Sequence, residues 1–377
     1  MFNRLYVHVP FCIKKCHYCA FISVTPEHNA LVEYPALLLS ELQLHTTGSE
    51  PLASIYFGGG TPSLLQPLQL GGLLEGIRAH TGIRGDAEIT LEANPGTVTP
   101  ASLKEFRGAG INRISLGIQS FDDRFLEVMG RIHTAEQSQQ AFLDAREAGF
   151  SNISIDLIHS LPEQSLDQWR SELLHAIALS PEHISIYGLT VEDGTPFASL
   201  YPPNSPELAD DDLSADMFEL ADELLTGAGF EHYEIANYAR PGCRSQHNSG
   251  YWRRDGYLGL GVAAHSFIHD GYGVRFSNPD NLDEYRQGAA SGRMARIDEQ
   301  KLTLDDAMAE YMFLGLRLAD GVCAQAFERE FGLSLESVYG SIAVDLVRLG
   351  LLIQNGSQHT LTHRGMLLSN QVFSRFL

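Results

Sequence analysis

The sequence predicts an α/β fold, a partial (β/α)6 barrel with an open side, followed by a C-terminal α+β extension of winged-helix-like type. Between residues 5 and 189, six short apolar segments alternate with helical patterns, which is typical of a parallel sheet with right-handed crossovers. Unusual residues close or follow five of these segments, at Cys12, Gly58, Glu92, Gln119 and Asp156. Barrel enzymes build their sites at this end of their strands.

Each element of the barrel follows from a local pattern. Short runs of apolar and β-branched residues predict six strands, at residues 5–9, 54–57, 87–92, 113–118, 151–158 and 183–187. Helices are expected at residues 30–45, 67–80, 100–109, 135–148 and 166–179. Three of these helices have start signals, at Thr99-Pro100, at Thr134 with Gln137, and at Ser165 with Gln168. An open doubly wound sheet would satisfy the same alternation, and the residues at the strand ends favour the barrel.

We divide the chain into three regions, with the barrel at residues 1–200. Residues 201–300 form an acidic helix and a connecting region rich in glycine and aromatic residues, after a Pro-rich loop. Apolar residues recur on one face of that helix, at Leu213, Met217, Leu220 and Leu224. Residues 301–377 form the winged-helix-like module, with a small wing at residues 351–353 and 359–361.

Composition argues against several classes of partner. The formal net charge is −21, which argues against nucleic acid and against anionic lipid, because both attract Lys and Arg. No Lys or Arg lies between Arg170 and Arg240, so this stretch is either a solvated acidic face or a docking surface for a basic partner. No apolar run reaches the roughly 18 residues of a membrane span. We also find no signal peptide and no disulfide framework, and we expect the reducing cytoplasm.

Three cysteines lie in one loop directly after the first strand. Cys12, Cys16 and Cys19 are four and then three positions apart, and thiolates are soft ligands that suit iron–sulfur clusters, Zn or Cu(I). A closed metal site would need a fourth ligand, and neither His8 nor His17 gives the spacing of a zinc finger. Three thiolates on four irons would leave one iron open to an exogenous ligand. Free thiols or a zinc knuckle are the alternatives.

The other strand ends carry candidate binding residues. Gly58 to Pro62 lets the backbone approach a ligand closely, although a tight turn would use the same residues, and no Lys-Ser/Thr follows to make a phosphate loop. Glu92 ends an apolar strand and needs a partner, which a ribose hydroxyl or an ammonium would supply. The Gln119 amide can donate and accept. Asp156 is either a satisfied core group or a site group, and Arg131 could pair with it or with another carboxylate.

The Cys-x3-Cys-x2-Cys loop after a first strand resembles the radical S-adenosylmethionine (SAM) superfamily. Within it, the chain resembles the oxygen-independent coproporphyrinogen oxidase family, at residues 6–12, 57–62, 117–121, 155–158 and 310–321. The likeness covers essentially the whole chain. It implies a [4Fe-4S] cluster on Cys12, Cys16 and Cys19, with SAM chelated to the open iron. It also implies SAM contacts from Tyr6, Gly59, Gly60, Thr61, Glu92, Gln119, Arg131 and Asp156.

Two departures separate this chain from the oxidases of that family. The oxidases have a further cysteine where this chain has Phe21, and a longer segment before the first strand. Both departures match a branch of haem chaperones, which also carries a His-Asn-x-x-Tyr-Trp signature. In this chain that signature is His247, Asn248, Tyr251 and Trp252. The resemblance implies haem contacts from these residues, with His247 as an axial ligand. Without this resemblance, residues 247–252 would be interpreted as a structural anchor of a loop.

The expected function is therefore that of a haem chaperone, which binds haem, a [4Fe-4S] cluster and SAM and passes haem to an acceptor protein. An electron donor for the cluster is implied, and peripheral contact with a membrane is compatible with the sequence. The alternative is an enzyme that decarboxylates the propionates of coproporphyrinogen III to give protoporphyrinogen IX. A radical SAM enzyme of RNA modification is disfavoured by the acidic composition.

Overall fold

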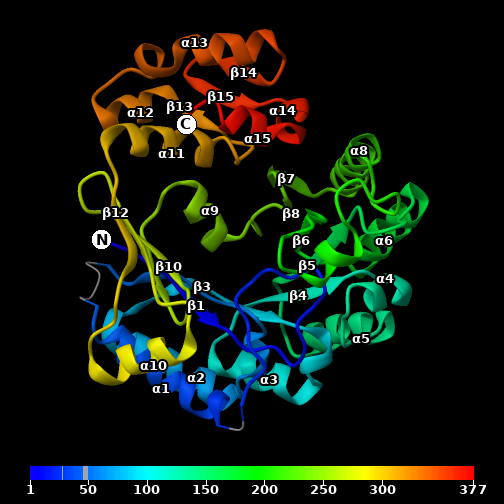
Figure 1. Ribbon diagram of the computed structural model, residues 1–377, viewed down its shortest axis with the longest axis vertical. Coiled ribbons are helices and arrows are strands. Elements are labelled where there is room, and N and C mark those ends of the chain that lie inside the picture. Colours follow the sequence, from blue (N-terminus) through cyan, green and yellow to red (C-terminus); the bar gives the residue numbers. More distant parts are fainter. Residues whose placement is uncertain (28, 46–49) are drawn as a thin grey trace.

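The computed structural model describes residues 1–27, 29–45 and 50–377. Its main sheet contains six parallel strands that pair in the order of the sequence (Figure 1). These strands are β1 (Arg4–Val9), β2 (Leu52–Gly59), β3 (Ile83–Ala93), β4 (Arg113–Gln119), β5 (Ile153–His159) and β6 (His183–Gly188). A doubly wound sheet would reverse its strand order part-way, so the consecutive order confirms the predicted partial barrel.

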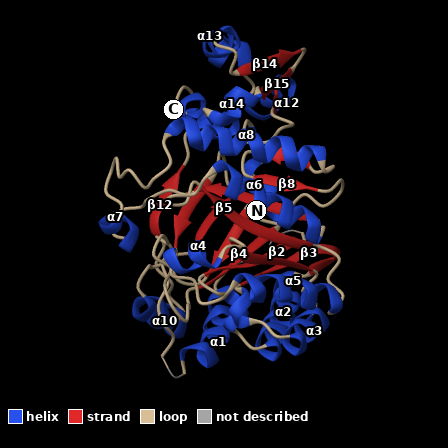
Figure 2. Cartoon of the chain, turned by 90° about the vertical axis from the view of Figure 1, so that its right-hand side faces the viewer, coloured by secondary structure: helices blue, strands red, loops and turns tan. Residues whose placement is uncertain are grey.

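The crossover helices confirm the expected alternation. They are α1 (Ala30–Leu42), α2 (Pro67–Thr81), α3 (Pro100–Ala109), α4 (Asp123–Val128), α5 (Ala135–Glu147) and α6 (Leu166–Leu179), with short 3₁₀ helices η1 (Pro62–Leu64) and η2 (Pro95–Thr97). Thr134 and Ser165 form the capping boxes that the sequence predicts. Helix α1 ends three residues earlier than expected, and α4 was not predicted because it has only six residues. Figure 2 shows α1, α2, α3 and α5 against one face of the curved sheet.

Residues 201–300 extend this sheet at both edges. Strands β8 (Asn237–Ala239) and β7 (Glu231–Glu234) follow β6, and β9 (Tyr257–Leu260) pairs in parallel with β1. Strands β10 (His265–Ile268), β11 (Val274–Ser277) and β12 (Ile297–Lys301) continue beyond β9. The sequence did not predict these strands, because runs of three to five residues are too short to show a clear alternation. The same region contains α8 (Asp211–Gly227), α9 (Gln246–Trp252) and α10 (Leu282–Ser291), and α7 (Pro196–Leu200) lies directly before it.

The alternation along the barrel strands separates an apolar outer face from a polar inner face. Leu5, Val7 and Val9 of β1 are buried in the main hydrophobic core, and Tyr6 lies on the opposite face of the same strand. Tyr6 is level with Tyr56 of β2 in the parallel register. Since neighbouring strands share the same alternation, polar side chains of successive strands meet inside the barrel.

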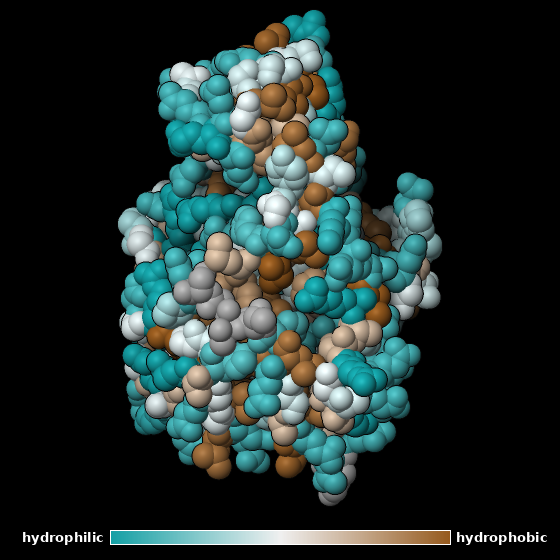
Figure 3. Space-filling model, turned by 90° about the vertical axis from the view of Figure 1, so that its left-hand side faces the viewer, coloured by the Kyte–Doolittle hydropathy of each residue, from teal (hydrophilic) through white to brown (hydrophobic). Residues whose placement is uncertain are grey.

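The C-terminal residues form a separate module with its own core (Figure 1, orange and red). It consists of α11 (Leu304–Gly315), α12 (Ala324–Phe331), α13 (Leu335–Arg348), α14 (His363–Leu367) and α15 (Ser369–Phe373), with strands β13 (Val322–Cys323), β14 (Leu352–Asn355) and β15 (Gln358–Leu361). The hairpin β14–β15 is the predicted wing. On the side seen in Figure 3 the surface is mostly hydrophilic, with hydrophobic patches on this module and also over the middle and lower parts of the molecule. In the described ranges, no helix has the length and apolar character to cross a membrane.

Candidate functional site

The cysteine loop is tied both to itself and to the barrel. Cys12 N–H donates to Val24 O at 3.0 Å, and Val24 N–H donates to Pro10 O at 2.7 Å, which joins the two ends of the loop through an isolated bridge between Phe11 and Val24. A ring nitrogen of His17 lies 2.9 Å from Val128 O at the end of α4. These bonds hold Cys12, Cys16 and Cys19 as partly exposed free thiols beyond the C-terminal end of β1.

Two of the three sulfurs receive polar contacts from predicted site residues. Thr61 Oγ1 donates to Cys12 Sγ at 3.6 Å, and Arg131 Nη1 donates to Cys16 Sγ at 3.3 Å. Burial raises the pKa of Cys19, and the neighbouring Cys16 and Cys12 raise it further. In the described part of the chain, no three His, Cys, Asp or Glu side chains converge as ligands of a single metal ion would. Three thiols with donors directed at sulfur fit the ligand set of an iron–sulfur cluster.

Gly60 allows the glycine-rich segment to pass directly beside the cysteine loop. A Cβ atom at this position would lie 2.7 Å from Phe11 O and 3.0 Å from Cys12 Sγ. Any larger residue would therefore push the loop away from β2. The structure thus brings Gly60, Thr61 and Arg131 together with the cysteines, as the sequence led us to expect.

Glu92 lies inside the barrel next to the same glycine-rich segment. Its Oε1 accepts from Tyr56 OH at 2.7 Å, and its Oε2 accepts from Gly59 N–H at 3.2 Å. Burial raises the pKa of Glu92 to about 7, while the bond from Tyr56 lowers it and the charge of Asp156 raises it. Tyr6 stacks on Tyr56, with ring centroids 6.2 Å apart. Glu92 is thus a partly exposed hydrogen-bond acceptor near the cysteine loop.

Asp156 is already held by serine hydroxyls. Ser115 Oγ lies 3.2 Å from both carboxylate oxygens. Burial raises the pKa of Asp156, whereas the hydroxyl of Ser185 and the charge of Arg113 lower it. Arg131 instead bonds Cys16 and Gly117 O, the latter at 2.6 Å. The suggested pairing of Arg131 with Asp156 was therefore wrong, because the guanidinium is directed at the cysteine loop.

Gln119 ends β4 in an unusual backbone conformation, with φ at +69°. This backbone conformation costs a residue other than glycine roughly 1–3 kcal/mol, and it persists only where contacts with the surrounding structure offset that cost. Glu172 of α6 supplies that support, because its two oxygens accept from Ser120 Oγ and Phe121 N–H, both at 2.6 Å. The turn after Gln119 is thereby fixed by a carboxylate that is 53 residues further along the chain.

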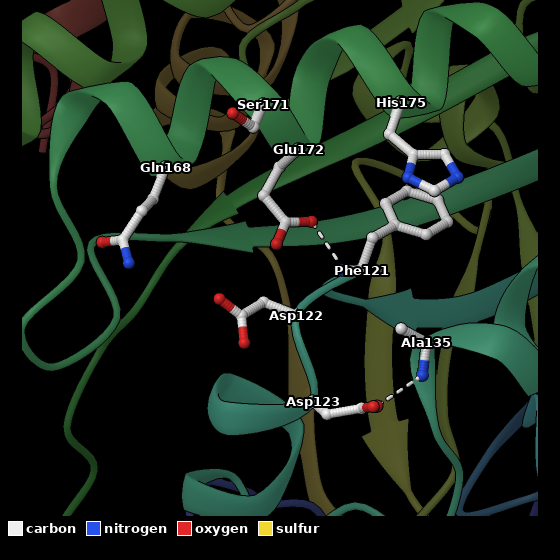
Figure 4. Close-up of a pocket in the computed structure, with 8 residues that line it drawn as sticks. All are labelled: Phe121, Asp122, Asp123, Ala135, Gln168, Ser171, Glu172 and His175. Atoms are coloured by element: carbon white, nitrogen blue, oxygen red, sulfur yellow. Dashed lines mark hydrogen bonds between the residues drawn. The ribbon is translucent and has the colours of Figure 1, made fainter.

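No sequence pattern singles out Glu172, because it lies in an ordinary amphipathic helix. It lines a cavity of about 520 Å³ between α6 and the start of α5 (Figure 4). In the same view, Phe121 stacks on His175 with centroids 4.1 Å apart, and Asp123 accepts from Ala135 N–H at 2.7 Å. Glu172 and Asp123 thus act as hydrogen-bond acceptors, and Glu172 stabilises the turn that follows Gln119. Burial also raises the pKa of Glu172 to about 6.

Replacing Glu172 with Gln should disturb the conformation of Gln119. Glutamine has no charge and one acceptor oxygen in place of two, so the charge-assisted bonds from Ser120 Oγ and Phe121 N–H weaken. This change should cost about 1–3 kcal/mol of unfolding free energy and weaken the SAM binding that the sequence leads us to expect. Calorimetric SAM titration and denaturant unfolding would measure both effects. His175→Ala removes the ring stack but neither hydrogen bond, so it should keep wild-type SAM affinity. Equal affinity loss in both variants, or none in Glu172→Gln, would contradict the positioning role.

His247 lies in the interior, with its ring fully buried. One ring nitrogen is 2.8 Å from Ser54 Oγ, and the other is 2.7 Å from Tyr251 OH. Burial lowers the pKa of His247 well below its usual range, and Arg4 and Arg113 lower it further. Because both ring nitrogens are in use, this arrangement favours the structural anchor over an axial ligand of iron.

Helix α9, which carries His247, is fixed to the barrel at its N-terminus. The carboxylate of Glu88 in β3 accepts from the N–H groups of Gln246 and His247, both at 2.9 Å, where a helix favours negative charge. Gly250 is required because a Cβ there would lie 1.9 Å from Arg4 Nε. The other three predicted haem contacts lie on the same helix and are partly exposed: Asn248, Tyr251 and Trp252.

The buried state of His247 predicts an acid-sensitive contribution to stability. Below a pH of about 6.5 the unfolded chain binds a proton at this residue that the folded protein does not bind. As the pH decreases below that value, this group alone should lower the free energy of unfolding by about 1.4 kcal/mol for each pH unit. Denaturant titrations at several pH values should show that His247→Gln lacks this component. Parallel pH profiles for the two proteins would contradict the buried neutral imidazole.

Comparisons with known proteins agree with this geometry. The radical SAM superfamily model matches residues 6–174, and the HemN C-terminal domain model matches residues 302–368. A curated protein named heme chaperone HemW from Lactococcus lactis is 36% identical and covers 100% of this chain and 97% of its own length. The chain belongs to the HemW family. The proteins named heme chaperone HemW from Bacillus subtilis and Escherichia coli are also 36% identical to this chain, and each match covers 99% of it.

A solved structure resembles the whole molecule. The coproporphyrinogen III oxidase HemN of Escherichia coli, described as a radical SAM enzyme, superposes with a TM-score of 0.85. The match covers 100% of this chain and 90% of that chain, at 24% sequence identity. At this identity the likeness shows a shared fold, including the C-terminal module. The HemW family and HemN thus share one architecture.

Proposed function

We propose that the protein is a haem chaperone, which binds haem, a [4Fe-4S] cluster and SAM and transfers haem to an acceptor protein. The observation that carries this proposal is the set of three thiols with sulfur-directed donors, in a chain that matches HemW proteins along its whole length. In this proposal residues 1–200 hold the cluster and SAM, and residues 201–300 and 301–377 complete the haem site. The three thiols would require a reducing compartment such as the cytoplasm.

The cluster would be held by Cys12, Cys16 and Cys19, and when bound it would chelate SAM and supply electrons to it from a donor. The chain's own residues would position SAM around this point. Gly59 and Gly60 would present backbone groups to its amino acid part, and the partly exposed carboxylate of Glu92 can accept from its ammonium or hydroxyl groups. The remaining proposed contacts are Tyr6, Thr61, Gln119, Arg131 and Asp156.

The thiol set can be tested independently of haem. Changing Cys16 to Ser should abolish the iron–sulfur absorbance of anaerobically reconstituted protein, because one of three thiolate ligands is lost. Arg131→Met removes the donor to Cys16 Sγ and the donor to Gly117 O but none of the thiolate ligands, so it should keep iron but lower the reduction potential of the cluster. Iron analysis and redox titration would measure both. Full iron content in Cys16→Ser would contradict the assigned ligands.

The haem function is tested by titrating anaerobic, reconstituted protein with haem and following the Soret band. We expect saturable binding, and no protoporphyrinogen IX when the same preparation is given SAM and coproporphyrinogen III. His247→Gln should retain haem binding if the buried imidazole is an anchor, and should lose it if the ring rotates out to bind iron. Absence of specific haem binding, or efficient decarboxylation, would overturn the chaperone proposal in favour of the oxidase.

A further inference from the structure

The segment Glu310–Gly321, which the sequence likeness singled out without giving it a role, attaches the C-terminal module to the barrel. Glu310 accepts from Arg254 Nε at 3.2 Å and from Arg275 Nε at 2.6 Å. Ala319 N–H donates to Tyr233 O of β7 at 2.9 Å. The contacts of Glu310 satisfy both carboxylate oxygens, so this residue has a sufficient role in holding the module in place.

Arg317 in the same segment has no comparable partner. Its guanidinium lies over the ring of Trp252, 4.2 Å from the centroid. The carboxylate that it approaches is Glu234, with Nη2 and Oε2 3.9 Å apart, which is too long for a hydrogen bond. Among the residues that the structure describes, Arg317 Nε, Trp252 Nε1 and Glu234 Oε2 are buried without a hydrogen-bond partner. Such atoms carry an energetic penalty that a ligand could remove.

Glu234 is a weak competitor for this guanidinium. Its side chain is fully buried, and its other oxygen already accepts from Ala236 N–H at 3.1 Å and from the Asn237 amide. Burial raises the pKa of Glu234, although the charge of Arg317 lowers it. Since the pair does not close to hydrogen-bond distance, the guanidinium keeps donor capacity for a second acidic group.

The site is accessible and close to the barrel interior. The Arg317 side chain is 27% exposed, and Tyr187 at the end of β6 is 45% exposed. Tyr187 is near enough to interact electrostatically with Arg317 and also with Asp156. Trp252 belongs to the same short helix as His247 and Tyr251. One unpaired donor, Trp252 Nε1, therefore belongs to the proposed haem segment, and the Arg317 guanidinium lies directly beside it.

We propose that Arg317 and Trp252 bind a propionate carboxylate of haem, an inference that rests on the proposed haem function. A guanidinium matches a carboxylate with two parallel hydrogen bonds, and Trp252 Nε1 supplies a further donor. The indole face supplies a flat apolar surface beside the macrocycle. The carboxylate thus satisfies the buried donors, and the haem is oriented with one propionate toward the C-terminal module.

The proposal is tested with the full-length, reconstituted protein and two probes, haem and haem dimethyl ester, in the same detergent-containing buffer. Wild-type protein should bind haem at least about tenfold more tightly than the ester, roughly the value of one charge-assisted hydrogen bond. Arg317→Gln should bind both probes equally, at the affinity that the wild type has for the ester. Arg244→Gln is the matched control, because Arg244 is paired with Glu231 and Asp320 and its variant should keep the tenfold preference.

The outcomes separate the two proposals. Equal affinity of the wild type for haem and ester, or an unchanged preference in Arg317→Gln, would overturn the propionate site while leaving haem binding intact. Binding of neither probe by the wild type would overturn the haem function and this site with it. If Arg317→Gln does not fold, Arg317→Lys keeps the charge without the paired donors, and it should show a reduced preference. A full preference in Arg317→Lys would overturn the bidentate contact.

Discussion

The carboxylate of Glu92 is the point on which the interior of the barrel depends. A carboxylate that is partly withdrawn from solvent needs hydrogen-bond partners, and here Tyr56 OH and Gly59 N–H both donate to it. These bonds fix the end of β2 against β3 and direct the glycine-rich segment toward the cysteine loop. The Tyr56 ring also contacts His247, with centroids 5.2 Å apart. Tyr56 therefore connects the glycine-rich end of β2 to helix α9, because it contacts both Glu92 and His247.

Much of the fold could be predicted because its signals are local. Alternating apolar residues, proline after an N-cap and capping boxes identified the barrel strands and most of their helices. The edge strands β7–β12 escaped prediction because they have only three to five residues each, and because β8 and β9 join the sheet through β6 and β1, which lie far away in the chain. The burial of His247 depends on Ser54, which lies 193 residues earlier. No pattern around residues 247–252 carries that information, since an exposed ligand and a buried anchor share the same sequence.

The site residues also divide into those that local sequence patterns identify and those that depend on contacts between distant segments. Cys12, Cys16, Gly60, Thr61 and Arg131 were found by type and position, and the structure brings them together. Glu172 and Arg317 were not assigned a role, because each acts through a contact between distant segments. Glu172 supports a turn that is strained for Gln119, and Arg317 lies against a helix that belongs to another region of the chain. Sequence patterns identify groups that carry chemistry more readily than the groups that hold them.

The position of β1 has a consequence for how the chain is made. This strand leads into the cysteine loop and lies between β2 and β9, so its second neighbour consists of residues 257–260. During synthesis the ribosome releases β1 first, and one edge of it stays unpaired until two-thirds of the chain has emerged. An unpaired edge is a template for the wrong partner. A chain truncated before residue 257 would thus expose one edge of the strand that leads into the cysteine loop.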